Sequence, residues 1–528
     1  MHRWSGWLRR SDVRTVLLPS LGITVLSILT AAGLSIFLDQ RATLTERAER
    51  LSARGDFEGA DRLYSQSLSL EGIHLETLIA RIDNLALIRL RAQMYGVRPG
   101  DDGIRRLLEG RKVDRSTAIL GSFWYDIQLG DGETDETPVL ALAEVDPPVR
   151  WANHLLGRSR MIAGDSVGAA ERFEWEGLSF PAEASDDLER ALRIWSEEEE
   201  WDVLRERVSD PRFSSVAGPW HRVSLALHDR DWATVLLWLW PASLHGAERW
   251  PLFLAVVAGI LWFLIASRMG RIEEGGRERR LLYISAFLLG ILSVYPTLVL
   301  IIVEEEIFGL AVTGQPVADA IYFIFGVGLR EELSKLLLFL PLLPVLNRRG
   351  SRIEALACGA LVGLGFAAEE NINYFRMMDA SAALGRFLTA NFLHMALTGM
   401  VGVAAYDASS TRRRPRGSLN EAFIFAMIVH GAYDFFLVSP VVEGASLIAM
   451  ILFVLISQRF LRELLFAAPD AQRGALLRIF VLSLAILTGL SYIYAATLVG
   501  PLRALGLMVT GALGVAILIY MFVRELGT

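Results

Sequence analysis

The 528-residue sequence contains one cysteine, Cys358, which lies inside an apolar run. A single cysteine excludes a disulfide framework and a cysteine-rich zinc site. Charged residues make up only 21% of the chain, against about 25% in an average globular protein, and the formal net charge is −7. No basic block interleaved with aromatic residues occurs, which argues against nucleic-acid binding. Lysine is scarce too, because only Lys112 and Lys335 among the 52 lysines and arginines are lysines.

Hydrophobic residues, in contrast, make up 53% of the chain, and the mean hydropathy is +0.38. They cluster in runs of about 20 residues, the length that a helix needs to cross a bilayer. The sequence therefore predicts an all-α polytopic membrane helix bundle with about ten spans. These are Thr15–Leu38, Pro251–Ser267, Leu281–Val303, Ala320–Leu346, Ala355–Phe375, Phe387–Tyr406, Ala422–Val438, Val441–Gln458, Ile479–Gly500 and Ala504–Val523.

The first of these runs is interpreted as a membrane anchor. Thr15–Leu38 carries no charge, is long for a signal peptide and lacks a small-residue cleavage site. We therefore expect residues 1–38 to form a cytoplasmic N-terminus followed by an anchor helix.

Residues 39–249 are polar, rich in Glu, Arg, Ala and Leu, and show no strand-like alternation. We expect them to form one α-helical domain. Two segments, Gly55–Ala60 and Gly164–Ala169, share the pattern Gly-Asp-x-x-Gly-Ala. Both resemble the start of the second helix of a tetratricopeptide unit, where a small alanine packs between paired helices. Their separation is not a multiple of 34 residues, so an irregular helical domain is an equally good interpretation.

Arginines indicate the orientation. With a cytoplasmic N-terminus, the segments on the cytoplasmic side carry 21 arginines and the short loops outside carry three. Since positive residues gather on the cytoplasmic side, both termini are predicted to be cytoplasmic and the 39–249 domain extracytoplasmic.

Four consecutive predicted spans contain nearly all the ionisable residues that would lie in lipid. Each such residue costs roughly 2.5–3.5 kcal/mol on insertion scales, so each needs a reason. At about 1.5 Å of rise per residue, the glutamates and histidines of these spans come within about 10 Å of one another in depth and could meet in one cavity. The ionisable residues are Arg330, Glu331, Glu332, Lys335, Glu369, Glu370, His394, His430 and Asp434, and the amides Asn371, Asn373 and Asn391 lie in the same spans.

The first of these spans carries a pair of adjacent glutamates. Glu331 and Lys335 are four residues apart, so they share a helix face and can neutralise each other. Glu332 is expected to point elsewhere and not to use the same lysine. Adjacent carboxylates repel, which leaves one protonated beside an ionised base, as general acid–base hydrolysis requires.

The later spans carry histidines. A lone buried histidine such as His394 is more often a packing residue than a ligand. His430 and Asp434 are four residues apart, so the carboxylate can orient the imidazole or both can bind a metal. Two histidines with Glu370 or Asp434 could hold zinc with an open position. No His-Glu-x-x-His motif is present, and a metal-free diglutamate mechanism fits the residues equally well.

Together these motifs resemble the PrsW intramembrane proteases, relatives of the CAAX-prenyl endopeptidases. The matching residues are Glu331-Glu332-x-x-Lys335, Phe366-x-x-x-Glu370-Asn371, His394 with Thr398, and His430-x-x-x-Asp434, in order and one per span. The resemblance covers roughly residues 280–440, about a third of the chain. It leaves the 39–249 domain and the last two spans unexplained.

The resemblance implies hydrolysis of peptide bonds in single-pass membrane proteins, including anti-sigma factors, at a bacterial cytoplasmic membrane. By motif, Glu331 and Glu332 would activate water and protonate the leaving amine, with Lys335 beside them. His394 and His430 would position the water or stabilise the oxyanion. Glu370, Asn371 and Asp434 would orient them. On this basis residues 250–440 are expected to form the protease core and 441–528 additional membrane helices.

Two other functions remain open from the sequence. A proton- or cation-coupled transporter also places carboxylates and histidines at the midplane of the membrane, although no internal repeat of these helices is evident. A receptor or scaffold would use the 39–249 domain to bind a protein partner, because stacked helical pairs offer a concave surface, but that function leaves the buried charges unexplained.

Overall fold

The computed structural model describes residues 11–94, 103–109, 113–130, 134–246, 249–377, 389–409, 417–442, 444–468 and 473–526. All secondary structure in these ranges is helical, which confirms the all-α prediction. The chain divides into two compact units. One consists of Met1–Leu34 and Gly246–Thr528, and the other of Ser35–His245. Lys112 and the start of the predicted span Phe387–Tyr406 lie outside the described residues.

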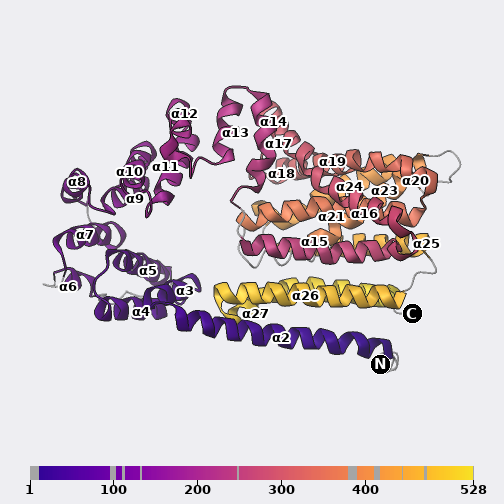
Figure 1. Ribbon diagram of the computed structural model, residues 1–528, viewed down its shortest axis with the longest axis horizontal. Helices are drawn as coiled ribbons and strands as arrows, with labels where there is room; N and C mark the ends of the chain where they lie inside the picture. The colour runs from indigo at the N-terminus through magenta and orange to yellow at the C-terminus, as the bar shows by residue number, and fades with distance from the viewer. Residues whose placement is uncertain are drawn as a thin grey trace. The chain divides into compact units, whose positions relative to one another are not determined.

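The unit Ser35–His245 is built from short helices that pack in sequence order (Figure 1). Successive helices such as α3 and α4, α9 and α10, and α13 and α14 contact each other along their length. The helices are α3 (Leu44–Ala53), α4 (Phe57–Leu70), α5 (Leu75–Met94), α6 (Ile104–Leu108), α7 (Arg115–Leu129), α8 (Thr137–Ala143), α9 (Ala152–Ala163), α10 (Ser166–Ser179), α11 (Ser185–Glu197), α12 (Trp201–Ser209), α13 (Pro219–His228) and α14 (Trp232–Leu244).

The repeated Gly-Asp-x-x-Gly-Ala pattern forms the turn between paired helices. Gly55 has a φ of +74°, a left-handed conformation that glycine adopts without strain. Asp56 then caps α4 by accepting a hydrogen bond from Gly59 N–H. Residues 164–169 repeat this arrangement. The alanine of each motif, Ala60 in the first, is fully buried between helices.

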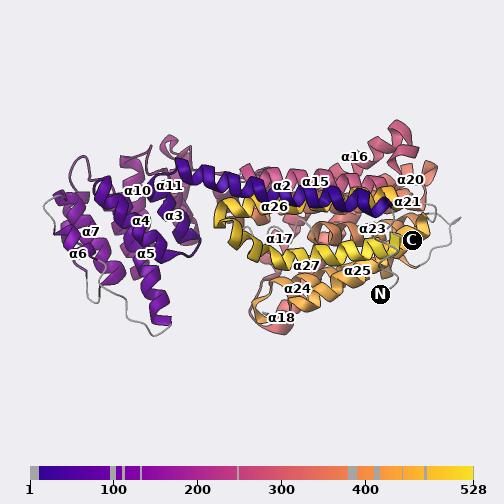
Figure 2. The same ribbon diagram turned by 90° about the horizontal axis from the view of Figure 1, so that it is seen from below.

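The other unit contains the long apolar helices. These are α2 (Ser11–Arg41), whose first part belongs to this unit, α15 (Arg249–Met269), α16 (Gly276–Leu292), α17 (Val294–Phe308), α18 (Pro316–Ile321), η3 (Tyr322–Gly328), α19 (Leu329–Phe339), α20 (Leu343–Arg349), α21 (Arg352–Met377), α23 (Asn391–Ala408), α24 (Leu419–Val438), α25 (Ser446–Ala467), α26 (Arg473–Val499) and α27 (Pro501–Leu526). The helix α2 lies beside α26 in both views (Figures 1 and 2), and Ser27 lies against Gly489.

Among the described residues, five helical segments are long and apolar enough to cross a membrane, or six when the bent pair Pro501–Val509 and Gly514–Glu525 is one span. The other five are Leu18–Arg41, Arg249–Met269, Gly276–Glu305, Leu419–Val438 and Gly474–Val499. The protein is therefore a multi-pass membrane protein. The further predicted spans fall on α19, α21, α23 and α25, which are not among these candidate spans.

One predicted span is confirmed with a small interruption, and another begins later than predicted. Leu281–Val303 lies within the candidate span Gly276–Glu305, in which α16 ends at Leu292 and α17 begins at Val294. The run predicted at Val441–Gln458 starts later, since α25 begins at Ser446 and continues to Ala467. Pro440 and Gly444, which has a φ of +89°, interrupt the backbone before it.

Glycines bring the site-bearing helices close together. A Cβ on Gly363 of α21 would lie 2.3 Å from the carbonyl oxygen of His394 on α23. One turn earlier, a Cβ on Gly359 would lie 2.6 Å from the oxygen of Thr398. Small residues four apart on one helix face permit such close backbone approach in membranes. They fix the position of His394 relative to α21.

A second close approach positions the diglutamate. The residues before it, Tyr322–Gly328, form the π-helix η3, a rare structure that occurs frequently at functional sites. It packs on α24 so closely that a Cβ on Gly431 would lie 2.2 Å from Phe323 O, and one on Gly328 would lie 2.3 Å from Met427 O. His430, next to Gly431, is thereby held beside the glutamates that follow η3.

We predict that Gly431→Ala separates η3 from α24 and impairs the site. Inserting a methyl group into a packed contact costs about 1–3 kcal/mol, and here the neighbouring atom is backbone. The expected result is a lower midpoint of thermal unfolding in detergent and reduced proteolysis. Gly506→Ala in α27 is the matched control, because nothing lies within 4 Å of its Cβ position. Equal behaviour of the two variants would contradict this view of the packing.

Candidate active site

Four helices contribute the side chains that the sequence singles out. Glu331, Glu332 and Lys335 lie on α19, Glu370 and Asn371 on α21, His394 on α23, and His430 and Asp434 on α24. Glu332, Lys335 and both histidines are 0–2% exposed, so the groups that titrate are removed from solvent. The structure brings all four helices together at one polar cluster.

Lys335 lies at the centre of this cluster. Its Nζ lies 2.9 Å from Glu332 Oε1 and 3.3 Å from Glu331 Oε2. The prediction that Glu332 points away from the lysine is therefore wrong. Residues three and four apart are both neighbours on a helix, and the long lysine side chain reaches both carboxylates. The aromatic ring of Phe366 covers the ammonium at 4.1 Å.

Lys335 also connects the glutamates to the first histidine. Its Nζ lies 2.8 Å from His394 Nδ1. The opposite ring nitrogen, Nε2, lies 3.1 Å from Glu370 Oε2. His394 is thus held on both sides by charged groups and is not a simple packing residue. Beside it, Asn371 donates to Asn391 at 2.9 Å and so ties α21 to α23.

The second histidine faces both glutamates. His430 Nδ1 donates to Glu332 Oε1 at 2.9 Å. On the other side of the ring, Nε2 lies 3.5 Å from Glu331 Oε2 and 3.4 Å from Asp434 Oδ2. The predicted i,i+4 relation of His430 and Asp434 thus produces a contact between their side chains, and the diglutamate provides two more.

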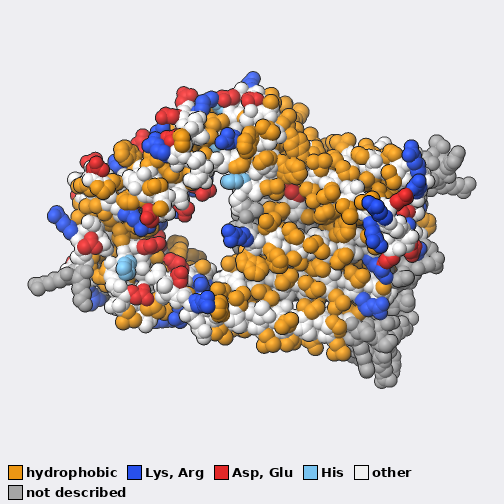
Figure 3. All heavy atoms as spheres, in the orientation of Figure 1, with side chains coloured by type: hydrophobic (Ala, Val, Ile, Leu, Met, Phe, Trp, Pro, Cys, Tyr) orange, Lys and Arg blue, Asp and Glu red, His pale blue; other side chains and the backbone are white. Residues whose placement is uncertain are grey.

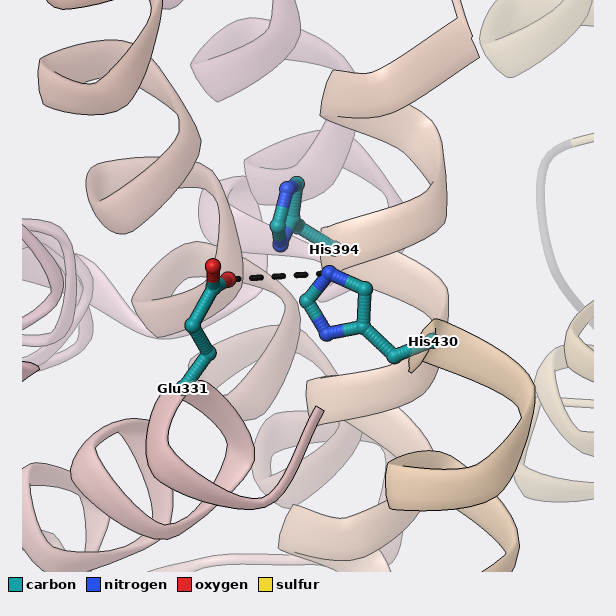
Figure 4. Close-up of side chains that lie close together, drawn as sticks. All are labelled: Glu331, His394 and His430. Carbon is teal, nitrogen blue, oxygen red and sulfur yellow. Dashed lines mark ion pairs between the residues drawn. The ribbon is translucent and has the colours of Figure 1, made fainter. Parts of the chain in front are cut away.

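Glu331, His394 and His430 form a group that could hold a metal ion. Each offers one ligand atom, and these atoms all lie within 4.8 Å of one another. Figure 4 shows the carboxylate of Glu331 facing the ring of His430, with His394 beside them, each from a different helix. One carboxylate and two imidazoles match the ligand set of catalytic zinc sites. The sequence placed Glu370 or Asp434 in the carboxylate position, whereas the geometry favours Glu331.

Oε2 of Glu332 is buried and has no hydrogen-bond partner among the described residues. The other oxygen of this carboxylate accepts from Lys335 and His430. An unsatisfied buried carboxylate oxygen is costly and marks a place where another polar group, such as water, is accommodated. Its position beside Glu331, His394 and His430 fits a group that would hold a metal ion.

The sequence reasoning missed one contact that supports the site. Arg330 forms an ion pair with Glu304 of α17, with 2.6 Å between Nη1 and Oε2, and both side chains are largely buried. Glu304 directly follows the predicted span Leu281–Val303. The sequence does contain a signal for this ion pair, because Arg330 is a charged residue next to the diglutamate and needs a partner of opposite charge in the membrane.

Comparison with known proteins places this cluster in a family. Residues 278–457 match the family model of the PrsW family intramembrane metalloproteases. This segment is a PrsW family intramembrane metalloprotease domain. No curated protein and no solved structure matches the chain. The resemblance inferred from the motifs is confirmed, and all eight predicted site residues lie within the matched segment.

The PrsW domain identifies the chain as a peptide hydrolase that acts in the membrane. Its substrates are therefore proteins. The family description as metalloproteases agrees with the buried group of Glu331, His394 and His430.

We predict that the purified protein binds one equivalent of zinc at this group. Glu331→Gln, His394→Ala and His430→Ala are each expected to weaken zinc binding by at least about tenfold, a loss of about 1.4 kcal/mol. Metal content after dialysis and titration calorimetry would measure this. His74→Ala, which changes an exposed histidine of the other unit, should leave binding unchanged. Parental zinc binding in all three site variants would rule out the group as the metal site.

Proposed function

We propose that this protein is an intramembrane endopeptidase that cleaves single-pass membrane proteins, such as anti-sigma factors, within or beside the bilayer. The observation that carries the proposal is the buried cluster in which α19 and α24 hold Glu331, Glu332 and His430 within hydrogen-bonding or ion-pair distance. A peptide bond in the membrane needs a general base and water in an apolar environment. The cluster supplies both the base and a polar place for the water.

Glu331, His394 and His430 would hold the metal ion. When bound, such an ion polarises the scissile carbonyl and acidifies the attacking water. The chemistry of the ligand set favours zinc. Lys335 offsets the negative charge of the two glutamates, which allows both carboxylates to remain in a buried site.

Glu332 is proposed as the general base. Its Oε2 has no hydrogen-bond partner among the described residues and so is available to take a proton from water. Its Oε1 is fixed by Lys335 and His430, which hold the carboxylate in one orientation. The same carboxyl group would then donate its proton to the leaving amine.

The remaining predicted residues are proposed to position these groups. Glu370 contacts His394, and Asp434 contacts His430, so the two carboxylates orient the imidazoles. Asn371 acts less directly, because its hydrogen bond to Asn391 connects α21 to α23, the helix that carries His394. None of these three needs to touch the substrate.

The proposed topology follows the positive-inside pattern. It has about ten spans, cytoplasmic termini and an extracytoplasmic domain at residues 39–249, in a bacterial cytoplasmic membrane. The α25 helix would then cross the membrane although its last turns carry Arg459, Arg462 and Glu463, because these lie at its cytoplasmic end. The protease core would span residues 250–440, with further membrane helices at 441–528.

A survey of new protein N-termini in membranes tests the activity. Cells with the parent are compared with cells that carry Glu331→Gln and Glu332→Gln together at matched abundance. Since general acid–base catalysis contributes about 10²–10⁴-fold, a set of termini should fall by that factor in the variant. Glu273→Gln with Glu274→Gln is the matched control, because these adjacent glutamates are exposed.

The termini lost in the site variant would identify substrates and locate the cut relative to the bilayer. No difference between parent and site variant, under stress as well as at rest, would contradict proteolysis. Ion-driven uptake into proteoliposomes that depends on the same glutamates would then favour a transporter.

We also propose that the 39–249 domain docks substrates or senses a partner. Paired helices stacked in sequence order offer an extended surface for a protein. Deleting residues 39–249 is expected to change which membrane proteins are cleaved or to slow their cleavage. Zinc stoichiometry of the deletion variant shows whether the membrane unit remains folded. Unchanged cleavage rates and substrates in a variant with normal zinc content would contradict the docking role.

A further inference from the structure

A cavity that is separate from the active site lies at one end of the membrane helices. Its volume is about 560 Å³, and its lining comes from α21, α23, α24, α25 and the residues just before α24. None of the metal-binding group lines it. Along α23, the lining residue Asp407 lies thirteen residues beyond His394, which is about 20 Å of helix. The cavity is therefore a distinct site.

One wall of this cavity is an ion-pair network centred on one arginine. Arg352, at the start of α21, pairs with Asp407 at the end of α23. It also pairs with Glu463 of α25, with 2.8 Å between Nη2 and Oε1. This network holds three helix ends together. Its arginine is already shared by two carboxylates and contributes no spare positive charge.

Two further arginines line the cavity and remain available. Arg459 and Arg462 are exposed and lie three residues apart on α25, so they are neighbours on its surface. The guanidinium of Arg459 lies over the ring of Phe425 at 4.0 Å. Such stacking leaves the N–H groups at the edge of the guanidinium free to bind a phosphate. Among the described residues, neither arginine forms an ion pair.

An acidic group lies at the start of α24. Glu421 is exposed and takes part in a capping box, in which Ser418 N–H donates to its Oε2 at 3.2 Å. Its other oxygen has no hydrogen bond among the described residues. Among the residues that the structure describes, the lining thus holds three arginines and three carboxylates, and their formal charges cancel. A ligand that carries one positive and one negative charge complements such a lining.

The location points to a lipid. The helix α24 is a candidate membrane span that begins at Leu419, so the cavity lies at the end of a span, at the depth of lipid headgroups. Apolar side chains, including Met400, Val403 and Phe466, share the lining with the charges. Figure 3 shows charged side chains of both signs gathered at the end of this unit where Figure 1 labels α20 and α25, with hydrophobic atoms beside them.

We infer that this cavity binds the headgroup of a zwitterionic phospholipid with a primary ammonium, of the phosphatidylethanolamine type. Arg459 and Arg462 bind the phosphate through charge-assisted hydrogen bonds. The ammonium donates to Glu421. Met400, Val403 and Phe466 contact the glycerol and the start of the acyl chains. A bound lipid at this point bridges the ends of α23, α24 and α25. Two of these helices, α23 and α24, carry the histidines of the active site. The inference is independent of the proposed peptide-bond hydrolysis.

Native mass spectrometry of the full-length protein in detergent tests this inference. The protein is titrated with phosphatidylethanolamine, phosphatidylglycerol, phosphatidylcholine and soluble glycerophosphoethanolamine. We expect one phosphatidylethanolamine to bind more tightly than either other lipid. Phosphatidylglycerol lacks the ammonium, and the methylated ammonium of phosphatidylcholine has no N–H to donate. The soluble headgroup is expected to bind much more weakly because it has no acyl chains.

Three variants separate the contacts. Arg459→Gln with Arg462→Gln should weaken the binding of phosphatidylethanolamine by about tenfold or more, since hydrogen bonds to charged groups are lost. Glu421→Gln, which keeps the capping box, should weaken phosphatidylethanolamine and leave phosphatidylglycerol unchanged. Arg277→Gln with Arg280→Gln is the control. It also removes two exposed arginines three residues apart, near the start of α16, outside the cavity.

Thermal unfolding and zinc content verify that each variant is folded. Parental binding of phosphatidylethanolamine by the Arg459→Gln, Arg462→Gln variant would overturn the inference. Equal or tighter binding of phosphatidylglycerol by the parent would overturn the zwitterionic assignment. Binding of glycerophosphoethanolamine as tight as that of the lipid would overturn the lipid assignment and indicate a soluble phosphate ligand.

Discussion

The burial of a single ammonium among carboxylates determines how this site is built. Lys335 is fully buried and contacts Glu331, Glu332 and His394. Two carboxylates in an apolar interior repel each other, and their isolated burial is prohibitively costly. The lysine offsets that charge and also fixes the positions of the groups. An arginine would not serve equally, because its planar guanidinium is larger and directs its hydrogen bonds in a fixed fork.

This charge cluster depends on close backbone packing elsewhere. Gly359 and Gly363 let α21 approach α23, and Gly431 lets α24 approach η3. These contacts set the distances between histidines and glutamates, because a side chain reaches only a few ångströms from its helix. The glycines carry no chemistry, but they decide whether the chemical groups meet. In the same way, the Arg330–Glu304 pair attaches the start of α19 to α17.

The helices of the two units are stabilised in different ways. In Ser35–His245, aspartate caps and left-handed glycines end one short helix and begin the next, so the chain turns repeatedly. In the membrane unit, long apolar helices satisfy their own backbone hydrogen bonds, and polar side chains lie where other helices cover them. The chain thus combines a unit of short paired helices with a membrane unit that shields a polar cluster.

Much of the site follows from sequence alone. Spacing along one helix is fixed by its rise and turn, so the pairs Glu331–Lys335 and His430–Asp434 could be predicted from their separation. The motifs, one per predicted span, also sufficed to identify the PrsW domain. Contacts between residues of different helices were harder to predict from the sequence. The sequence did not indicate that Lys335 reaches Glu332 and His394, that Asn391 pairs with Asn371, or that Arg330 pairs with Glu304.

The sequence by itself determined the helical class, the membrane association, the protease family and the residue types at the site. Tertiary structure alone places ligand atoms of Glu331, His394 and His430 within 4.8 Å of one another, and Arg459 and Arg462 in one cavity with Glu421. The physical reason is that helix geometry fixes which residues of one helix share a face. Which faces meet, and how closely, depends on side-chain volume and on the glycines at each crossing.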